Sequence, residues 1–361
     1  MRKLSAVAIV ATVFAGNVFA GDQSIKVISR GGWKYMNNDV QKTTKPNSSN
    51  FNFDYLRTKF SGELTPSVKY VLTTNLLKAD QANDTNEGIS KMISEGYVTK
   101  TFSFGTQMSF GRKTTIIGGR EYDYSSSDLY STSYFYDATP SPYAMGITLA
   151  HEVAGQTFRA QYINGNKTVS TTGTASQSKF GYALEWNGNL MDGMIKPIIS
   201  YTVIPEIAGA STTAKTTTNS STRANKGDDT FLGAGLQFNL PQNMILEADY
   251  NMLTEKDATG TTAAKKDLKT ESIVVHAKMN GETLSPFVKF IADTRKNDST
   301  KTDSRTAYDL GLEYKEAEED AIRYHVVYSG ASVKANINTT EVKSSPSSIM
   351  VGMKFTASLL K

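Results

Sequence analysis

The stretch "YDLGLEY" (residues 308–314) decides the fold, because apolar and polar residues alternate along it. Tyr and Leu occupy the even positions, while Asp, Gly and Glu occupy the odd ones. Successive side chains of a β-strand point to opposite faces, so the pattern predicts a strand with one apolar face. Three further stretches repeat it: "FGYALEW" (180–186), "IRYHVVY" (322–328) and "IMVGMKF" (349–355).

The composition of the two faces separates a membrane barrel from a soluble β-sandwich. A sandwich also alternates, but its solvent face usually carries many Lys, Glu and Thr. Here the second face is often Gly, Ala, Ser, Asn or a single charge, and aromatic residues end the apolar face. An apolar exterior with aromatic ends and a polar interior is typical of transmembrane barrels, whose strands need about ten residues to cross the hydrocarbon.

The same rhythm runs along the whole chain and predicts sixteen strands. They are 23–35, 51–64, 67–78, 93–104, 106–113, 143–153, 156–165, 177–188, 192–204, 230–240, 243–254, 270–281, 284–294, 305–316, 320–331 and 347–358. Short and long connections alternate between them. This favours an all-β, antiparallel, even-stranded barrel with short periplasmic turns, long external loops and both termini on the periplasmic side.

The first twenty residues predict export across the inner membrane. Arg2 and Lys3 precede an apolar run from Leu4 to Phe14, and small residues lead to Ala20. This is the pattern of a cleaved signal peptide, 1–20, whose apolar run is too short to span a bilayer. Residues 21–361 then form one barrel domain, and loss of the two basic residues lowers the formal net charge from +4 to +2. So balanced a charge argues against a nucleic-acid partner.

Two motifs resemble the general, sixteen-stranded porins of Gram-negative outer membranes. "SFGRK" (109–113) looks like the segment that ends the fifth strand and leads into the third external loop of that family. "SIMVGMKF" (348–355) looks like its closing strand, although Ala357 stands where members commonly have a terminal Phe. The resemblance implies a water-filled channel for passive diffusion of small hydrophilic solutes and ions. It also implies a homotrimer in contact with outer-membrane lipid and lipopolysaccharide.

The resemblance further implies that the third external loop, residues 114–142, folds into the lumen and narrows it. This loop contains "GGREYDYSSSDLYSTSYFYD" (118–137), with five tyrosines in twenty residues. The tyrosines favour packing of the loop on the inner wall over stacking on sugar rings. Four carboxylates of the loop would line the constriction, or else be solvated: Glu121, Asp123, Asp128 and Asp137.

Basic residues on the wall are expected to oppose these carboxylates. The register that sends neighbouring apolar residues outward sends four basic residues inward: Arg57, Lys59, Lys69 and Arg159. The inward register is favoured because a charge on the lipid face costs about 2–4 kcal/mol at the midplane. Arg112 is ambiguous, since alternation points it outward at a strand end whereas the resemblance makes it a lumen candidate.

Other functions find little support in the residues. His151, His276 and His325 lie on three separate predicted strands without cysteine partners, so no metal site or other cofactor is expected. Glu247 and Asp249 alternate inward on one strand, and wall charge is a simpler reading than a calcium site. No catalytic signature appears. Two alternatives to a general porin stay open: a channel selective for sugars or anions, and a non-conducting barrel acting as a surface adhesin or structural protein.

Overall fold

The computed structural model describes most of the chain outside the connections between strands. The described residues are 22–37, 47–78, 92–124, 128–139, 143–164, 180–205, 226–257, 267–297, 300–316, 321–337 and 340–360. The expected signal peptide (1–20) lies outside them, as do large parts of the expected long loops. Among the described residues, no helix has the length and apolar character to cross a membrane.

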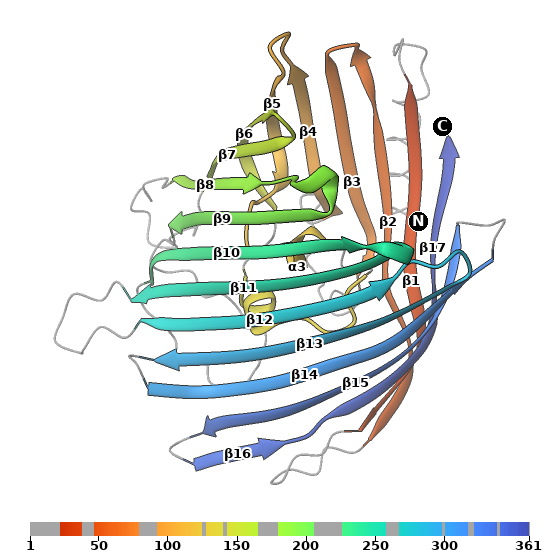
Figure 1. Ribbon diagram of the computed structural model, residues 1–361, viewed down its shortest axis with the longest axis vertical. Coiled ribbons are helices and arrows are strands. Elements are labelled where there is room, and N and C mark those ends of the chain that lie inside the picture. The colour runs from red at the N-terminus through yellow and green to blue at the C-terminus, as the bar shows by residue number, and fades with distance from the viewer. Residues whose placement is uncertain are drawn as a thin grey trace.

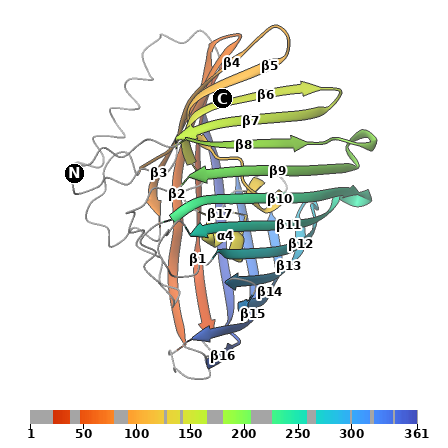
Figure 2. The same cartoon turned by 90° about the vertical axis from the view of Figure 1, so that its left-hand side faces the viewer.

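Within the described residues, seventeen β-strands form one antiparallel sheet that closes on itself (Figures 1 and 2). They are β1 (Gln23–Asn37), β2 (Ser48–Thr65), β3 (Val68–Lys78), β4 (Ile93–Thr101), β5 (Thr106–Thr114), β6 (Tyr143–Val153), β7 (Gln156–Asn164), β8 (Phe180–Asn187), β9 (Ile195–Pro205), β10 (Lys226–Leu240), β11 (Met244–Asp257), β12 (Leu268–Met279), β13 (Leu284–Asn297), β14 (Thr300–Lys315), β15 (Ile322–Ile337), β16 (Thr340–Ser344) and β17 (Ser347–Leu360). Consecutive strands pair from β1 to β16, β17 pairs with β15, and β1 pairs with both β2 and β17. The ring is therefore closed.

The wall nevertheless has sixteen strand positions, as the alternation predicts. The short strand β16 pairs with the outer end of β15, Val333–Ile337, and β17 pairs with the rest of β15, Ile322–Gly330. The two are parts of one wall strand, interrupted at Ser345 and Pro346. Proline has no N–H to give to the ladder, which explains the interruption. All sixteen predicted ranges correspond to a wall strand.

The predicted faces are confirmed. Leu310 and Val326 are about half exposed on the outside, whereas their neighbours Asp309 and His325 are buried on the inside. On β8, Leu184 is exposed and Ala183 is fully buried. The apolar side chains thus face outward and the polar ones inward, the reverse of a soluble protein.

Two of the expected long connections are largely strand. β13 continues to Asn297 and β14 begins at Thr300, so all of segment 295–304 that the structure describes is strand. Segment 332–346 is likewise mostly β15 and β16. The prediction that these were loops was wrong. Segment 295–304 has no apolar residue in the described strands, and the alternation of Val333, Ala335 and Ile337 in β15 is short and leads into polar residues.

Candidate functional site

The connection from β5 to β6 lies inside the barrel. We call residues 114–142 the interior segment; residues 125–127 and 140–142 lie outside its described part. The sequence shows no helical period there, yet two short helices form, α3 (Arg120–Asp123) and α4 (Tyr134–Ala138). Figures 1 and 2 show both within the ring of strands. The wall is in contact with nearly every described turn of the interior segment.

Wall side chains on β11 hold the start of α3. The carboxylate of Asp249 accepts hydrogen bonds from the backbone N–H groups of Arg120 (2.8 Å) and Glu121 (2.7 Å). The amide oxygen of Asn251 accepts one from the N–H of Gly119 at 2.8 Å. The first N–H groups of a helix have no partner within it, so the wall supplies the acceptors that α3 lacks.

Two further carboxylates, on β13 and β14, hold the second half of the interior segment. Asp293 accepts a hydrogen bond from the N–H of Tyr134 at 3.1 Å, and Asp309 accepts from the N–H (3.0 Å) and Oγ (2.5 Å) of Ser131. Arg305 ion-pairs with Asp293 at 2.6 Å and donates to the carbonyl of Thr132. Backbone groups that would otherwise be buried unpaired are therefore satisfied by the wall.

A buried ion pair joins the interior segment to β13. The Nζ of Lys289 lies 2.8 Å from Oε1 of Glu121, and both side chains are almost fully buried. Ser133 also donates to the Glu121 carboxylate through its N–H and its hydroxyl. Glu121 was predicted to line the constriction; it lies instead between the interior segment and the wall.

The aromatic residues of the interior segment pack rather than project. Phe135 is fully buried and meets Phe231 of β10 edge-on, with ring centroids 6.0 Å apart. Tyr122 packs edge-on against Phe135, and Tyr130 stacks on Phe287 of β13. Burial raises the pKa of the Tyr122 hydroxyl well above its ordinary value, so this side chain is neutral.

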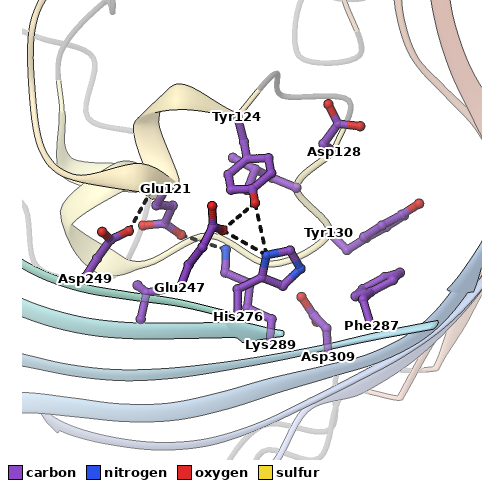
Figure 3. A pocket seen from close by; sticks show the side chains of 12 residues that line it. Glu121, Tyr124, Asp128, Tyr130, Glu247, Asp249, His276, Phe287, Lys289 and Asp309 are labelled. Carbon is purple, nitrogen blue, oxygen red and sulfur yellow. Dashed lines mark hydrogen bonds and ion pairs between the residues drawn. The ribbon is translucent and has the colours of Figure 1, made fainter. Parts of the chain in front are cut away.

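A small pocket lies between the interior segment and strands β11–β14 (Figure 3). The hydroxyl of Tyr124 donates to Glu247, whose carboxylate is 3.2 Å from Nδ1 of His276. Lys289 and Asp309 line the same pocket, and both bind the interior segment. Within the described residues no group of His, Asp and Glu has the arrangement to hold a metal ion.

The other predicted carboxylates have three different surroundings. Asp128 forms an ion pair with Lys354 of β17. Asp123 pairs with Arg120 at 3.2 Å, and 44% of its side-chain surface is exposed. Asp137 accepts a hydrogen bond from Thr132, lies 4.0 Å from Arg305 and is 52% exposed. Asp123 and Asp137 are thus the most exposed of the four predicted carboxylates, ahead of Asp128 at 31%.

Asp123 and Asp137 are both less acidic than an ordinary aspartate. Burial raises the pKa of Asp123, and the positive charges of Arg120 and Arg159 oppose this rise only in part. Burial also raises the pKa of Asp137, against the hydrogen bond from Thr132 and the charge of Arg305. Surrounding protein removes part of the solvent from both carboxylates, which disfavours their charged form.

The predicted basic residues are spread more widely. Arg57 shares the inner face of β2 with Lys59 and bonds to Asn75 at 2.9 Å. Arg159 of β7 ion-pairs with Glu185 and acts electrostatically on Asp123. Lys69 is also on an inner face, but it is 60% exposed and pairs with Glu63 beside the β2–β3 turn.

Arg112 lies on the outward side of β5 according to the strand register. It pairs with Gly96 and Met145, and Met145 and the neighbouring Phe110 are exposed on the outside. Of the two readings that the sequence allowed, the register favours the outward one.

Several residues that build the site were not singled out from the sequence as site residues. They are Arg30, Asp249, Asn251, Lys289, Asp293, Arg305, Asp309 and Lys354. Alternation places them on inner faces. Their partners are more than 90 residues away in the chain, so alternation alone cannot tell a docking group from general wall charge.

A closed antiparallel barrel with apolar outer and polar inner faces, narrowed by an inward segment, defines the porin class of outer-membrane channels. Three solved structures share the fold across almost the whole chain. An anion-selective porin from Comamonas acidovorans has a TM-score of 0.65 and 13% identity, covering 93% of this chain and 100% of that one. The outer membrane channel DcaP of Acinetobacter baumannii has a TM-score of 0.65 and 11% identity, with 93% and 97% covered. OmpT of Vibrio cholerae in its trimer form has a TM-score of 0.60 and 11% identity, with 94% and 100% covered.

The family assignment comes from the sequence itself. Residues 25–278 match the family described as phosphate-selective porin O and P, and the chain belongs to this family. No curated protein sequence matches the chain. The protein is therefore a channel of the Gram-negative outer membrane.

Proposed function

We propose that small hydrophilic solutes and ions cross the barrel through a neck between the interior segment and the inner wall of β2–β7. Most described wall contacts of the interior segment come from β9–β14, with others from Gln161 of β7, Arg30 of β1 and Lys354 of β17, and we assign the rest of the lumen to water. The observation that carries the proposal is the placement of the partly exposed Asp123, on α3, near Arg159 of the β7 wall, which acts on it electrostatically.

Charges of opposite sign face each other in this neck. Asp123 and Asp137 supply the negative side, and Arg57, Lys59 and Arg159 supply the positive side. Opposed charges in a narrow aqueous passage create a transverse field that orients dipolar solutes and disfavours apolar ones, while the bore excludes large ones. Diffusion down a gradient needs nothing more than this shaped and charged opening.

The remaining predicted constriction residues have other roles in this proposal. Glu121 and Asp128 fix the interior segment to the wall through Lys289 and Lys354. Lys69 contributes charge at the periplasmic rim, where it pairs with Glu63. We leave Arg112 out of the neck because of its outward register.

Anion selectivity is the second candidate, and one feature of the wall favours it. Lys113 on β5 lies over the ring of Tyr97 and near Arg159, which adds a further cation to the inner wall beside the neck. The family's description names phosphate. If the inner wall carries more cationic side chains than the facing interior segment carries carboxylates, the neck favours anions such as phosphate.

The assembly and the export of the chain are also part of the proposal. We propose a homotrimer, supported by the trimer form of the similar OmpT structure. Residues 1–20 would be removed during export, and the outer face would then contact lipid and lipopolysaccharide. Heat-modifiable migration and cross-linking in detergent test the trimer.

Planar-bilayer conductance of the purified protein under a salt gradient tests the channel and its selectivity. Stepwise conductance is expected, and the sign of the reversal potential gives the selectivity. A reversal potential on the anion side would favour the phosphate-type channel. A folded barrel that passes no current would overturn the proposal and point to a plugged surface protein.

Acidification is expected to reduce cation permeation through the neck. A raised pKa means that Asp123 and Asp137 bind protons at a higher pH than a solvated aspartate, for which the pKa is about 3.9. As the pH falls through the raised values, the neck loses negative charge and the reversal potential shifts toward anions. A shift that begins only near the ordinary aspartate value would contradict this assignment, as would the same shift in a variant with both residues changed to Asn.

A further inference from the structure

The start of the interior segment rests directly on the backbone of β10. A Cβ atom added to Gly233 would lie 2.5 Å from the Cα of Gly118, and it would overlap other backbone atoms of Gly118 as well. Gly118 itself has a φ of +75°, which an ordinary side chain would strain. Neither contacting residue can therefore carry a side chain without a shift of backbone.

Gly235 and Gly119, which lie next to this contact, also have no room for an added Cβ atom. Gly235 pairs with Asp249 in the β10–β11 ladder, and a Cβ on Gly235 would overlap the Asp249 carboxylate. A Cβ on Gly119 would lie 2.5 Å from Oδ1 of Asp249. The carboxylate fills the space that the two glycines leave, and from there it reaches the N–H groups of α3.

We propose that Gly233, Gly235 and Asp249 form a seat that sets the bore of the channel by fixing how deep the interior segment lies against the wall. This inference rests on the proposed neck between the interior segment and β2–β7. The three residues are positioning residues, because they act on the neck through α3. The seat would therefore influence which solutes fit the neck, in addition to the charged groups that line it.

The strength of the contacts decides which side would move. The β10 backbone is paired along its length with both β9 and β11. The start of the interior segment is held by hydrogen bonds to wall side chains, such as that from Ser200 to the carbonyl of Gly118 (2.7 Å). Side chains yield more readily than a paired backbone ladder, so a side chain inserted at Gly233 is expected to displace the interior segment away from β10.

The displacement narrows the neck. Carbon atoms in contact are about 3.5–4.0 Å apart, so a Cβ at Gly233 needs about 1 Å more room than the seat gives. Because α3 directly follows the seat and ends in Asp123, this movement carries Asp123 toward Arg159. The wall on the far side of the neck does not change.

The test compares Gly233→Ala with Gly96→Ala in the full-length protein. Gly96 also lies within a strand, but a Cβ there would meet Ile93 and Leu72 at the ordinary distances of 3.6 and 3.7 Å. Gly233→Ala is expected to lower single-channel conductance by roughly 1.2- to 2-fold, as for a shift of about 1 Å in a narrow pore. It should also lower the cut-off for neutral polymers. Gly96→Ala should leave both unchanged.

The outcomes separate the seat from the channel itself. Equal conductance and cut-off in the two variants, both with normal heat-modifiable migration, would overturn the seat. Silence of the wild-type protein and of Gly96→Ala would overturn the channel instead. Should Gly233→Ala fail to fold, Asp249→Asn keeps the size of the side chain while removing acceptor capacity toward α3. It is expected to increase current fluctuations in the open state, and an open channel as quiet as the wild type would reject the proposal.

Discussion

Replacing Lys289 with Met is expected to release the middle of the interior segment from the wall. The change leaves the Glu121 carboxylate buried without its ion-pair partner. Breaking a buried pair by removing one member typically costs about 3–5 kcal/mol, because the remaining charge is neither solvated nor compensated. Cleavage by a protease within residues 114–142 should become faster, and the channel current should become unsteady, while the barrel itself stays folded.

A second substitution distinguishes the effect of the uncompensated buried charge from the effect of lost packing. Glu121→Gln in the Lys289→Met background removes the uncompensated charge and should restore most of the protease resistance. Lys269→Met provides the matched control, since Lys269 pairs with Glu271 on the exposed outer face and such pairs contribute about 0–1 kcal/mol. Equal protease resistance in Lys289→Met and Lys269→Met would show that the buried pair does not hold the interior segment.

Neutralising Asp123 and Asp137 together should shift the channel strongly toward anions. A unit charge 4 Å from a permeating ion contributes about 1 kcal/mol in water, or roughly a fivefold change in local cation concentration for each carboxylate. Salt screens part of this effect, so the shift should be largest at low ionic strength. The measurement is the reversal potential of the Asp123→Asn, Asp137→Asn variant under a salt gradient.

The same exchange outside the neck serves as its control. Asp192 lies in the exposed β8–β9 turn, and Asp192→Asn should leave the reversal potential close to that of the wild type. If the double variant keeps wild-type selectivity, Asp123 and Asp137 do not face the permeating ions. The neck would then have to be sought elsewhere in the lumen.

The sequence was sufficient for the barrel wall because a membrane imposes a strict pattern. Each crossing strand must show an apolar side to lipid, so Leu310 and Val326 reveal the register of their strands. The same reasoning placed Arg57 and Arg159 inside. The alternation pattern did not predict the strands that continue past the membrane-spanning part of the wall, such as the outer extension of β15 and the short β16.

The interior segment was less predictable for a different reason. Its helices have few residues and no apolar period, since their partners are wall groups from distant strands. The sequence placed the Asp249 carboxylate on the inner face, but it did not predict that this carboxylate binds α3. No residue near Asp249 in the chain shows that α3 will lie there. The burial of Glu121 depends on Lys289, 168 positions later.

The attachment of the interior segment gives residues of the inner wall unequal freedom to change in evolution. Residues such as Asp249, Lys289 and Gln161 hold a folded element, so substitutions there alter structure before they alter permeation. Arg57 and Arg159 bond to other wall residues instead. In the proposed neck, new solute preferences can therefore arise at such positions by single substitutions, without changes to the rest of the barrel.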